Sequence, residues 1–160
     1  FDAMNKVWPP ARGAEDRAAL IEAVRDGTLD AVVSDHRPFT AEEKVVDFDR
    51  AEAGQATLET VFSLLNSRVL AGELELSDIG RMLAVGPRSI LGLAGGRIAK
   101  GQPADLVLID QSVSWTVNPD ELFSRGVNPP RSGAELTGRP FRTIRRGRVV
   151  HETGRTNGVA

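Results

Sequence analysis

A short apolar run at residues 29–34 constrains the fold of this chain more than any other feature. An amphipathic helix is predicted just before it, with acidic residues in its first turn and Gly27 directly after its last turn. A two-residue link joins that helix to the run, which is apolar enough to be a strand buried on both faces. A helix, a short link and a buried strand predict an α/β architecture with parallel strands.

The predicted strand ends at Asp35 and His36. In α/β folds this carboxyl edge is where ligands bind, because the loops there surround an open crevice. Residues 36–54 follow as a long polar loop, and a loop of this length inside a compact domain usually serves a function. Asp35 is therefore the first candidate site residue, with capping of the strand end as the structural alternative.

Further helices and strands are predicted from hydrophobic spacing. The expected helices cover residues 58–70, a short stretch capped by Ser77 and Asp78, and a stretch from Pro87 to near Gly92. After Gly95 and Gly96 the pattern changes to short strand-like runs at residues 97–100, 104–109, 115–117 and 141–150. Within the last run, Ile144 and Val149 flank a tight hairpin turn. We therefore divide the chain into an α/β part, residues 1–93, and an all-β part, residues 94–160.

Neither part is expected to be complete by itself. One buried strand and its helices cannot close a parallel sheet, which needs cover on both faces. The sequence also begins at Phe1 in what looks like an element already under way. We therefore expect the chain to be a piece of a longer protein, and these 160 residues alone not to form a stable monomer.

Composition excludes several classes of function. Twenty Lys and Arg residues against 22 Asp and Glu give a net charge of −2, which favours neither nucleic acid nor an acidic surface as a partner. The arginines within residues 142–148 alternate with apolar residues, as on the solvated face of a strand. No apolar stretch is long enough to span a membrane. The absence of cysteine fits a cytoplasmic protein, and two histidines are too few for a complete zinc site.

Motifs in serial order along nearly the whole chain resemble the second half of a dihydroorotase, within the amidohydrolase superfamily. They are Asp2, Lys6, Val7, Pro9, Pro10 and Arg12, then Asp16, Arg17 and Leu20, residues 26–30, Ser34, Asp35, His36 and Pro38, and then Thr40, Glu42, Glu43, Lys44, Phe48, Ala51, Gly54, Leu58, Glu59 and Thr60. Residues 95–108 resemble the β-segment shared across the superfamily, and Asn128, Pro129, Pro130, Gly133 and residues 138–147 resemble its closing strands.

The resemblance implies a fold divided between this chain and a preceding segment. Residues 1–93 would supply the last strands and helices of a (β/α)8 TIM barrel, and residues 94–160 the C-terminal strands of a small β-sandwich domain. The family's barrel holds one or two zinc ions, but its His-x-His ligands and bridging carboxylated lysine lie earlier than this chain begins. The implied partners are a small-molecule substrate, the N-terminal part of the barrel and further copies of the protein in a homo-oligomer.

The resemblance gives four residues a role in the site. Asp35 corresponds to the aspartate that binds one zinc ion and accepts a proton during attack on the cyclic amide, a role that suits a carboxylate beside a metal. Gly54 corresponds to a loop glycine whose backbone approaches the substrate ring, with an ordinary turn as the alternative. Trp8 and Phe39 replace an asparagine and a histidine that contact substrate in the family, which removes two polar contacts.

Two further positions carry smaller inferences from the resemblance. His36 matches a histidine of the family and is predicted to be structural. Ala11 stands where the family usually has leucine, a milder change that is consistent with a reshaped pocket.

Three functions fit these residues. The first is a zinc-dependent dihydroorotase that interconverts N-carbamoyl-L-aspartate and dihydroorotate in de novo pyrimidine biosynthesis, favoured by Asp35 and residues 42–44. The second is a catalytically inactive homologue that scaffolds aspartate transcarbamoylase, favoured by Trp8 and Phe39. The third is a related amidohydrolase that acts on another cyclic amide, for which a more apolar pocket would be suited.

Overall fold

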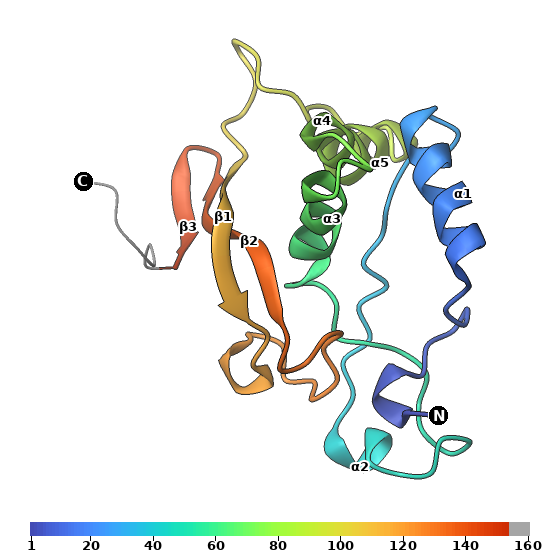
Figure 1. Ribbon diagram of the computed structural model, residues 1–160. Helices are drawn as coiled ribbons and strands as arrows, with labels where there is room; N and C mark the ends of the chain where they lie inside the picture. The colour runs from blue at the N-terminus through green and yellow to red at the C-terminus, as the bar shows by residue number, and fades with distance from the viewer. Residues whose placement is uncertain (154–160) are drawn as a thin grey trace.

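A computed structural model describes residues 1–153 and shows an α/β chain with one three-stranded antiparallel sheet (Figure 1). The helices are α1 (Ala14–Arg25), α2 (Ala41–Lys44), α3 (Val61–Leu70), α4 (Leu76–Gly80) and α5 (Gly86–Ile90). Short 3-10 turns cover Ala3–Asn5 and Pro119–Glu121, and a π-helical turn, Arg81–Val85, joins α4 to α5. The strands are β1 (Leu106–Thr116), β2 (Glu135–Arg145) and β3 (Arg148–Glu152), in the order β1-β2-β3. No helix within residues 1–153 has the length and apolar character needed to cross a membrane.

Helix α1 confirms its local sequence signals. The Gly13 N–H donates to Asp16 Oδ2 at 3.3 Å, which satisfies one of the free N–H groups at the start of the helix. Gly27 follows the last turn with a φ of +83°, a conformation that glycine adopts at little cost. The predicted stop is therefore correct to the residue.

Two other helices begin at different residues from those predicted. Helix α3 starts at Val61 rather than residue 58, because the N–H groups of Thr60 and Val61 both donate to Thr57 O at 3.0 Å in a preceding turn. Helix α4 is capped at Glu75, whose N–H donates to Asp78 Oδ2 at 2.9 Å. The predicted cap at Ser77 was wrong because Asp78 lies in the first turn, where its carboxylate can reach back to the cap residue.

The predicted parallel strand at residues 29–34 does not form within the described residues. In Figure 1 this light-blue segment runs as an irregular trace between α1 and α3. Its contacts include a hydrogen bond from the Val32 N–H to Met82 O at 3.1 Å, and a single parallel bridge, His36 to Gln55, follows it. A strand is defined by its neighbours, and residues 1–153 supply no ladder for this run.

The sheet differs from the strands predicted after residue 95 but contains the predicted hairpin. Residues 97–100 form no strand, and the predicted runs 104–109 and 115–117 join into β1, which carries a register shift between Asp110 and Ser114. The predicted hairpin is confirmed, with Ile144 paired to Val149 across a turn that contains Gly147.

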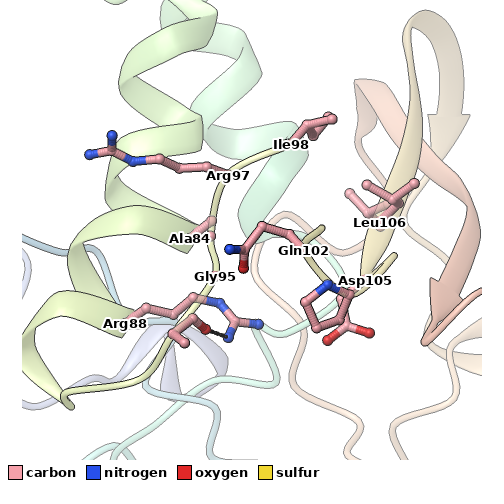
Figure 2. Close-up of a pocket in the computed structure, with 12 residues that line it drawn as sticks. Ala84, Arg88, Gly95, Arg97, Ile98, Gln102, Asp105 and Leu106 are labelled. Atoms are coloured by element: carbon pink, nitrogen blue, oxygen red, sulfur yellow. Dashed lines mark hydrogen bonds between the residues drawn. The ribbon is translucent and has the colours of Figure 1, made fainter. Parts of the chain in front are cut away.

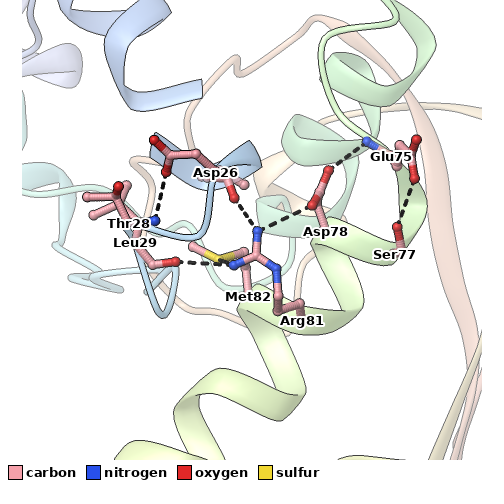
Figure 3. Close-up of polar contacts among 9 residues, drawn as sticks. Asp26, Thr28, Leu29, Glu75, Ser77, Asp78, Arg81 and Met82 are labelled. Carbon is pink, nitrogen blue, oxygen red and sulfur yellow. Dashed lines mark hydrogen bonds and ion pairs between the residues drawn. The ribbon is translucent and has the colours of Figure 1, made fainter. Parts of the chain in front are cut away.

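A small core joins α1 to the α4–α5 region. Its buried residues are Val24, Leu74 and Met82. Figure 3 shows the Arg81 guanidinium beside this core, where Nη1 donates to Leu29 O at 3.3 Å and Nη2 lies 3.3 Å from Asp78 Oδ1. Nη2 also donates to Val24 O at the end of α1, so one side chain caps α1 and ties it to α4.

Helix α3 packs directly on β2, across the predicted division near residue 93. Buried Asn66 donates from Nδ2 to Thr137 O at 2.9 Å and to Gln111 O at 3.1 Å, and buried Ser63 donates to Gly138 O. The sheet therefore meets the helical part through hydrogen bonds as well as apolar contact.

Substitution of Gly138 by alanine tests this junction. A Cβ there would lie 2.5 Å from Asn66 Nδ2 and 3.1 Å from Phe62 Cε1, and the residue has a φ of +90°. We expect the free energy of unfolding to fall by about 3 kcal/mol, measured by urea denaturation of the full-length protein.

Gly80→Ala is the matched control for Gly138→Ala. Gly80 lies in α4 with a φ of −59° and has open space around its Cβ position, so the substitution should leave stability unchanged or raise it by about 0.5–1 kcal/mol. Equal effects of the two substitutions would contradict the packing described here.

Candidate functional site

Three separate segments of the chain meet through backbone hydrogen bonds. We call them the site edge: residues 4–8, 35–39 and 54–57. The Gly54 N–H donates to Lys6 O at 2.9 Å, which joins the first segment to the third. The Arg37 N–H donates to Gln55 O at 2.8 Å beside the His36–Gln55 bridge, which joins the second to the third. All four predicted site residues lie on these segments.

Asp35 stands at the site edge with an accessible carboxylate. Its side chain is 52% exposed, and Oδ1 accepts a hydrogen bond from Arg37 Nε at 3.0 Å. Its φ is +44°, a left-handed conformation that is uncommon outside glycine and that often marks a turn or a functional site. The geometry therefore leaves this carboxylate free to meet a ligand.

His36 has a defined structural contact. Its Nδ1 accepts a hydrogen bond from the Leu58 N–H at 3.1 Å, which fixes the turn before α3. This contact agrees with the structural role predicted for His36. Among residues 1–153, no three His, Cys, Asp or Glu side chains gather closely enough to hold a metal ion. Asp35 contributes one exposed carboxylate to the site edge, whereas a zinc site needs about four ligands.

Gly54 is buried, and its neighbours account for the lack of a side chain. A Cβ there would lie 2.5 Å from Arg37 Cβ and 2.9 Å from Phe39 Cε2. Its carbonyl oxygen accepts hydrogen bonds from Asn128 Nδ2 at 3.0 Å and Lys44 Nζ at 3.3 Å. The structure therefore places Phe39 against Gly54 and secures the Gly54 backbone from two sides.

Trp8 lies on the same edge but faces solvent, with 69% of its surface exposed. Its segment is held in place by Lys6, whose Nζ donates to Phe48 O at 2.9 Å and to Asp49 O at 3.1 Å. Gly54 thus lies beside Phe39 and beside Arg37, and Arg37 contacts Asp35. Trp8 is connected to this group through the hydrogen bond between Lys6 O and the Gly54 N–H.

Sequence reasoning missed two buried polar residues beneath the site edge. Asn128 is fully buried; its Oδ1 accepts from the Phe39 N–H at 2.9 Å, and its Nδ2 donates to Arg37 O at 3.1 Å as well as to Gly54 O. Lys44 is also fully buried, and burial lowers the pKa of its ammonium, with the nearby charge of Lys6 adding to the effect. Both residues belong to the motifs that resemble a dihydroorotase. Lysine and asparagine are usually exposed, so no signal in the sequence marked them as buried.

A separate cavity of about 260 Å³ lies between α5 and the start of β1 (Figure 2). Arg88 lines it and donates to Ala94 O at 2.9 Å, and Asp105 accepts from the Arg146 N–H at 2.7 Å. These charged groups hold the segment before β1 and the β2–β3 turn in place. None of the predicted site residues lines this cavity, so we assign it no part in the candidate site.

The model of the amidohydrolase family matches residues 9–150 of this chain. A dihydroorotase of Anaeromyxobacter dehalogenans is 46% identical over 147 residues, which cover 92% of this chain and 34% of that protein. A dihydroorotase of Bacillus pumilus is 40% identical over 156 residues, covering 97% of this chain and 36% of that protein. The chain therefore spans about a third of the length of these curated relatives.

Solved structures of cyclic amide hydrolases have the same fold in the matching region. L-hydantoinase (dihydropyrimidinase) from Arthrobacter aurescens superposes with a TM-score of 0.85 at 30% identity, over 96% of this chain and 35% of that one. D-hydantoinase (dihydropyrimidinase) from Thermus sp. gives a TM-score of 0.85 at 27% identity, over 98% of this chain and 36% of that one. The fold of this chain is thus similar to that of about a third of each of these structures.

Proposed function

The chain belongs to the amidohydrolase family, and we propose that it forms the C-terminal part of a dihydroorotase. The proposed reaction is the interconversion of N-carbamoyl-L-aspartate and dihydroorotate in de novo pyrimidine biosynthesis. The observation that supports it most directly is the accessible Asp35 carboxylate, on an edge shared with Phe39 and Gly54, in a chain 46% identical to a dihydroorotase.

The proposed fold places residues 1–93 at the end of a (β/α)8 TIM barrel and residues 94–160 in a β-sandwich domain. Large apolar side chains support the proposal that another part of the protein covers this chain: Val33 is 79% exposed and Ile98 is 91% exposed. Residues 29–34 are mostly apolar yet have no sheet partner within residues 1–153, which fits a strand that pairs with a neighbouring barrel segment.

Zinc is the proposed cofactor, and Asp35 is the residue of this chain that would bind it. A carboxylate oxygen is a common zinc ligand. The remaining ligands would come from the barrel segment outside this chain. When bound, zinc would lower the pKa of a water molecule, so that this water can give up a proton near neutral pH and attack the amide carbon. The Asp35 carboxylate would accept the proton released in that attack and deliver it to the ring nitrogen as the C–N bond breaks.

The substrate ring is proposed to lie against a wall formed by Phe39 over the Gly54 backbone, with Trp8 at the rim of the pocket. Burial of Gly54 beneath Phe39 leaves one wall apolar at a point where a histidine would offer a hydrogen bond. Such a wall suits the flat face of a cyclic amide, while polar recognition would come from residues elsewhere in the barrel.

The other two functions remain alternatives to this proposal. An enzyme for another cyclic amide is consistent with the hydantoinase structures, but identity to these structures is 27–30%, against 40–46% for the dihydroorotases. An inactive homologue that scaffolds aspartate transcarbamoylase would be consistent with the apolar residues Trp8 and Phe39. A cytoplasmic location and a homo-oligomeric state remain predictions.

Turnover by the zinc-loaded, full-length protein tests the proposal. We expect ring opening of dihydroorotate with a kcat/KM about 100-fold above that for dihydrouracil, which lacks the ring carboxylate. Hydrolysis should be followed by loss of ring absorbance, with metal content measured in parallel. A preference for hydantoin or dihydrouracil would favour the third function, and a metal-loaded protein without turnover of any ring would favour the scaffold.

A further inference from the structure

Lys44 is a buried cation without a carboxylate partner. It ends α2, its side chain is fully buried, and it forms no ion pair within residues 1–153. Its ammonium instead donates to three backbone carbonyl oxygens, of Glu52 at 2.9 Å, Gly54 at 3.3 Å and Lys6 at 3.4 Å. One side chain thus joins two segments of the site edge to α2.

This arrangement is costly for a residue that only holds the backbone together. Removing an ammonium from water is unfavourable: burial and then the charge of Lys6 lower the pKa of Lys44, and the carboxylates of Asp2 and Glu52 offset this only in part. Asn128 is a neutral donor to the same Gly54 carbonyl, so a neutral side chain can make this type of contact here. What a cation adds is a stronger, charge-assisted hydrogen bond, and attraction to the face of an aromatic ring.

The ring attraction and one of the three charge-assisted hydrogen bonds reach the proposed substrate wall. Lys44 Nζ donates to Gly54 O and lies 6.0 Å from the centroid of the Phe39 ring. Gly54 and Phe39 are also in contact with each other, since Phe39 Cε2 occupies the space that a Gly54 side chain would need. The ammonium therefore restrains the Gly54 backbone and the Phe39 ring. It makes no hydrogen bond or ion pair with Asp35 among residues 1–153.

We propose that Lys44 is a positioning residue for the ring substrate: its ammonium fixes the Gly54 carbonyl and the Phe39 ring, and thereby sets substrate affinity. This inference rests on the proposed function, because it assigns Gly54 and Phe39 to the substrate wall. It predicts an effect on binding rather than on the reacting groups, since Lys44 touches neither the proposed metal ligand nor the proton path.

The test compares Lys44→Met, Lys44→Gln and the control Lys100→Met in the zinc-loaded, full-length enzyme. Lys100 is exposed, so its removal should change nothing. For Lys44→Met we expect KM for dihydroorotate to rise about tenfold with kcat within about threefold of wild type and unchanged zinc content. Lys44→Gln keeps a hydrogen-bond donor on a shorter side chain, so we expect its KM to lie between the KM of Lys44→Met and that of the wild type. It also serves as the measurable variant if Lys44→Met does not fold.

The outcomes separate this inference from the proposed function. An unchanged KM in both Lys44 variants, or a loss of kcat or zinc without a rise in KM, would overturn the positioning role while wild-type turnover upholds the dihydroorotase assignment. A wild-type enzyme that neither binds nor turns over dihydroorotate would overturn both. A rise in KM that follows the order Met, Gln, wild type supports the inference.

Discussion

Replacement of Asp35 by alanine is expected to lower kcat/KM for dihydroorotate at least about 1000-fold in the full-length enzyme. The proposed mechanism gives this carboxylate two tasks, one metal contact and the transfer of a proton to the ring nitrogen, and alanine can perform neither. Steady-state kinetics of the zinc-loaded protein measures the loss, and metal analysis shows how much of it follows from weaker zinc binding.

The fold should tolerate this change. The Asp35 side chain is 52% exposed and its ion pair with Arg37 is also exposed to solvent, so the pair contributes at most about 1 kcal/mol to stability. Asp30→Ala is the matched control, because Asp30 is an exposed aspartate five positions earlier on the same segment. Activity that survives Asp35→Ala, or is lost equally in Asp30→Ala, would show that the assignment of Asp35 is wrong.

Replacement of Asn128 by alanine is expected to lower the free energy of unfolding by about 3–5 kcal/mol. Asn128 is fully buried, and its amide makes hydrogen bonds with the Phe39 N–H and with the carbonyls of Arg37 and Gly54. Alanine would remove the Asn128 partner of the Phe39 N–H and the Arg37 carbonyl, and would leave the Gly54 carbonyl with Lys44 Nζ alone, in a site from which water is excluded. Urea denaturation of the full-length protein measures the change.

Asn118→Ala provides the comparison for Asn128→Ala. Asn118 also uses its side chain for hydrogen bonds, to the Asp120 N–H at 3.2 Å and to Glu121 Oε1 at 3.0 Å, but these contacts lie in an exposed turn. Its loss should cost about 1 kcal/mol, because water replaces the missing partners. If the two substitutions cost the same, Asn128 does not hold the site edge together in the way described.

The site itself was predicted in part. Asp35 was predicted at the carboxyl end of a parallel strand; that strand does not form within residues 1–153, and what the structure shows is that the Asp35 carboxylate is about half exposed. The position of Gly54 in the motif series marked it as special, but its contacts with Arg37 and Phe39 became visible only in three dimensions. Lys44 and Asn128 were not predicted, since their burial depends on partners up to 91 residues away.

The sequence by itself determined the elements whose signals are local. Helix α1 begins and ends where its acidic first turn and Gly27 predict, and the β2–β3 hairpin turns where Ile144 and Val149 predict. Such elements close their hydrogen bonds between near neighbours, so a few residues are sufficient to specify them. The serial order of the motifs likewise indicates the family.

Only the tertiary structure decided which distant segments meet. The run at residues 29–34 has the composition of a buried strand, yet it forms no ladder within residues 1–153, because pairing requires a neighbour that its own sequence does not supply. The site edge is held by the same kind of distant contact: Lys44 and Asn128 both donate to the Gly54 carbonyl from positions 10 and 74 residues away in the chain. Local propensity carries no information about such contacts, since a buried polar group is stabilised only once its partners have been brought to it.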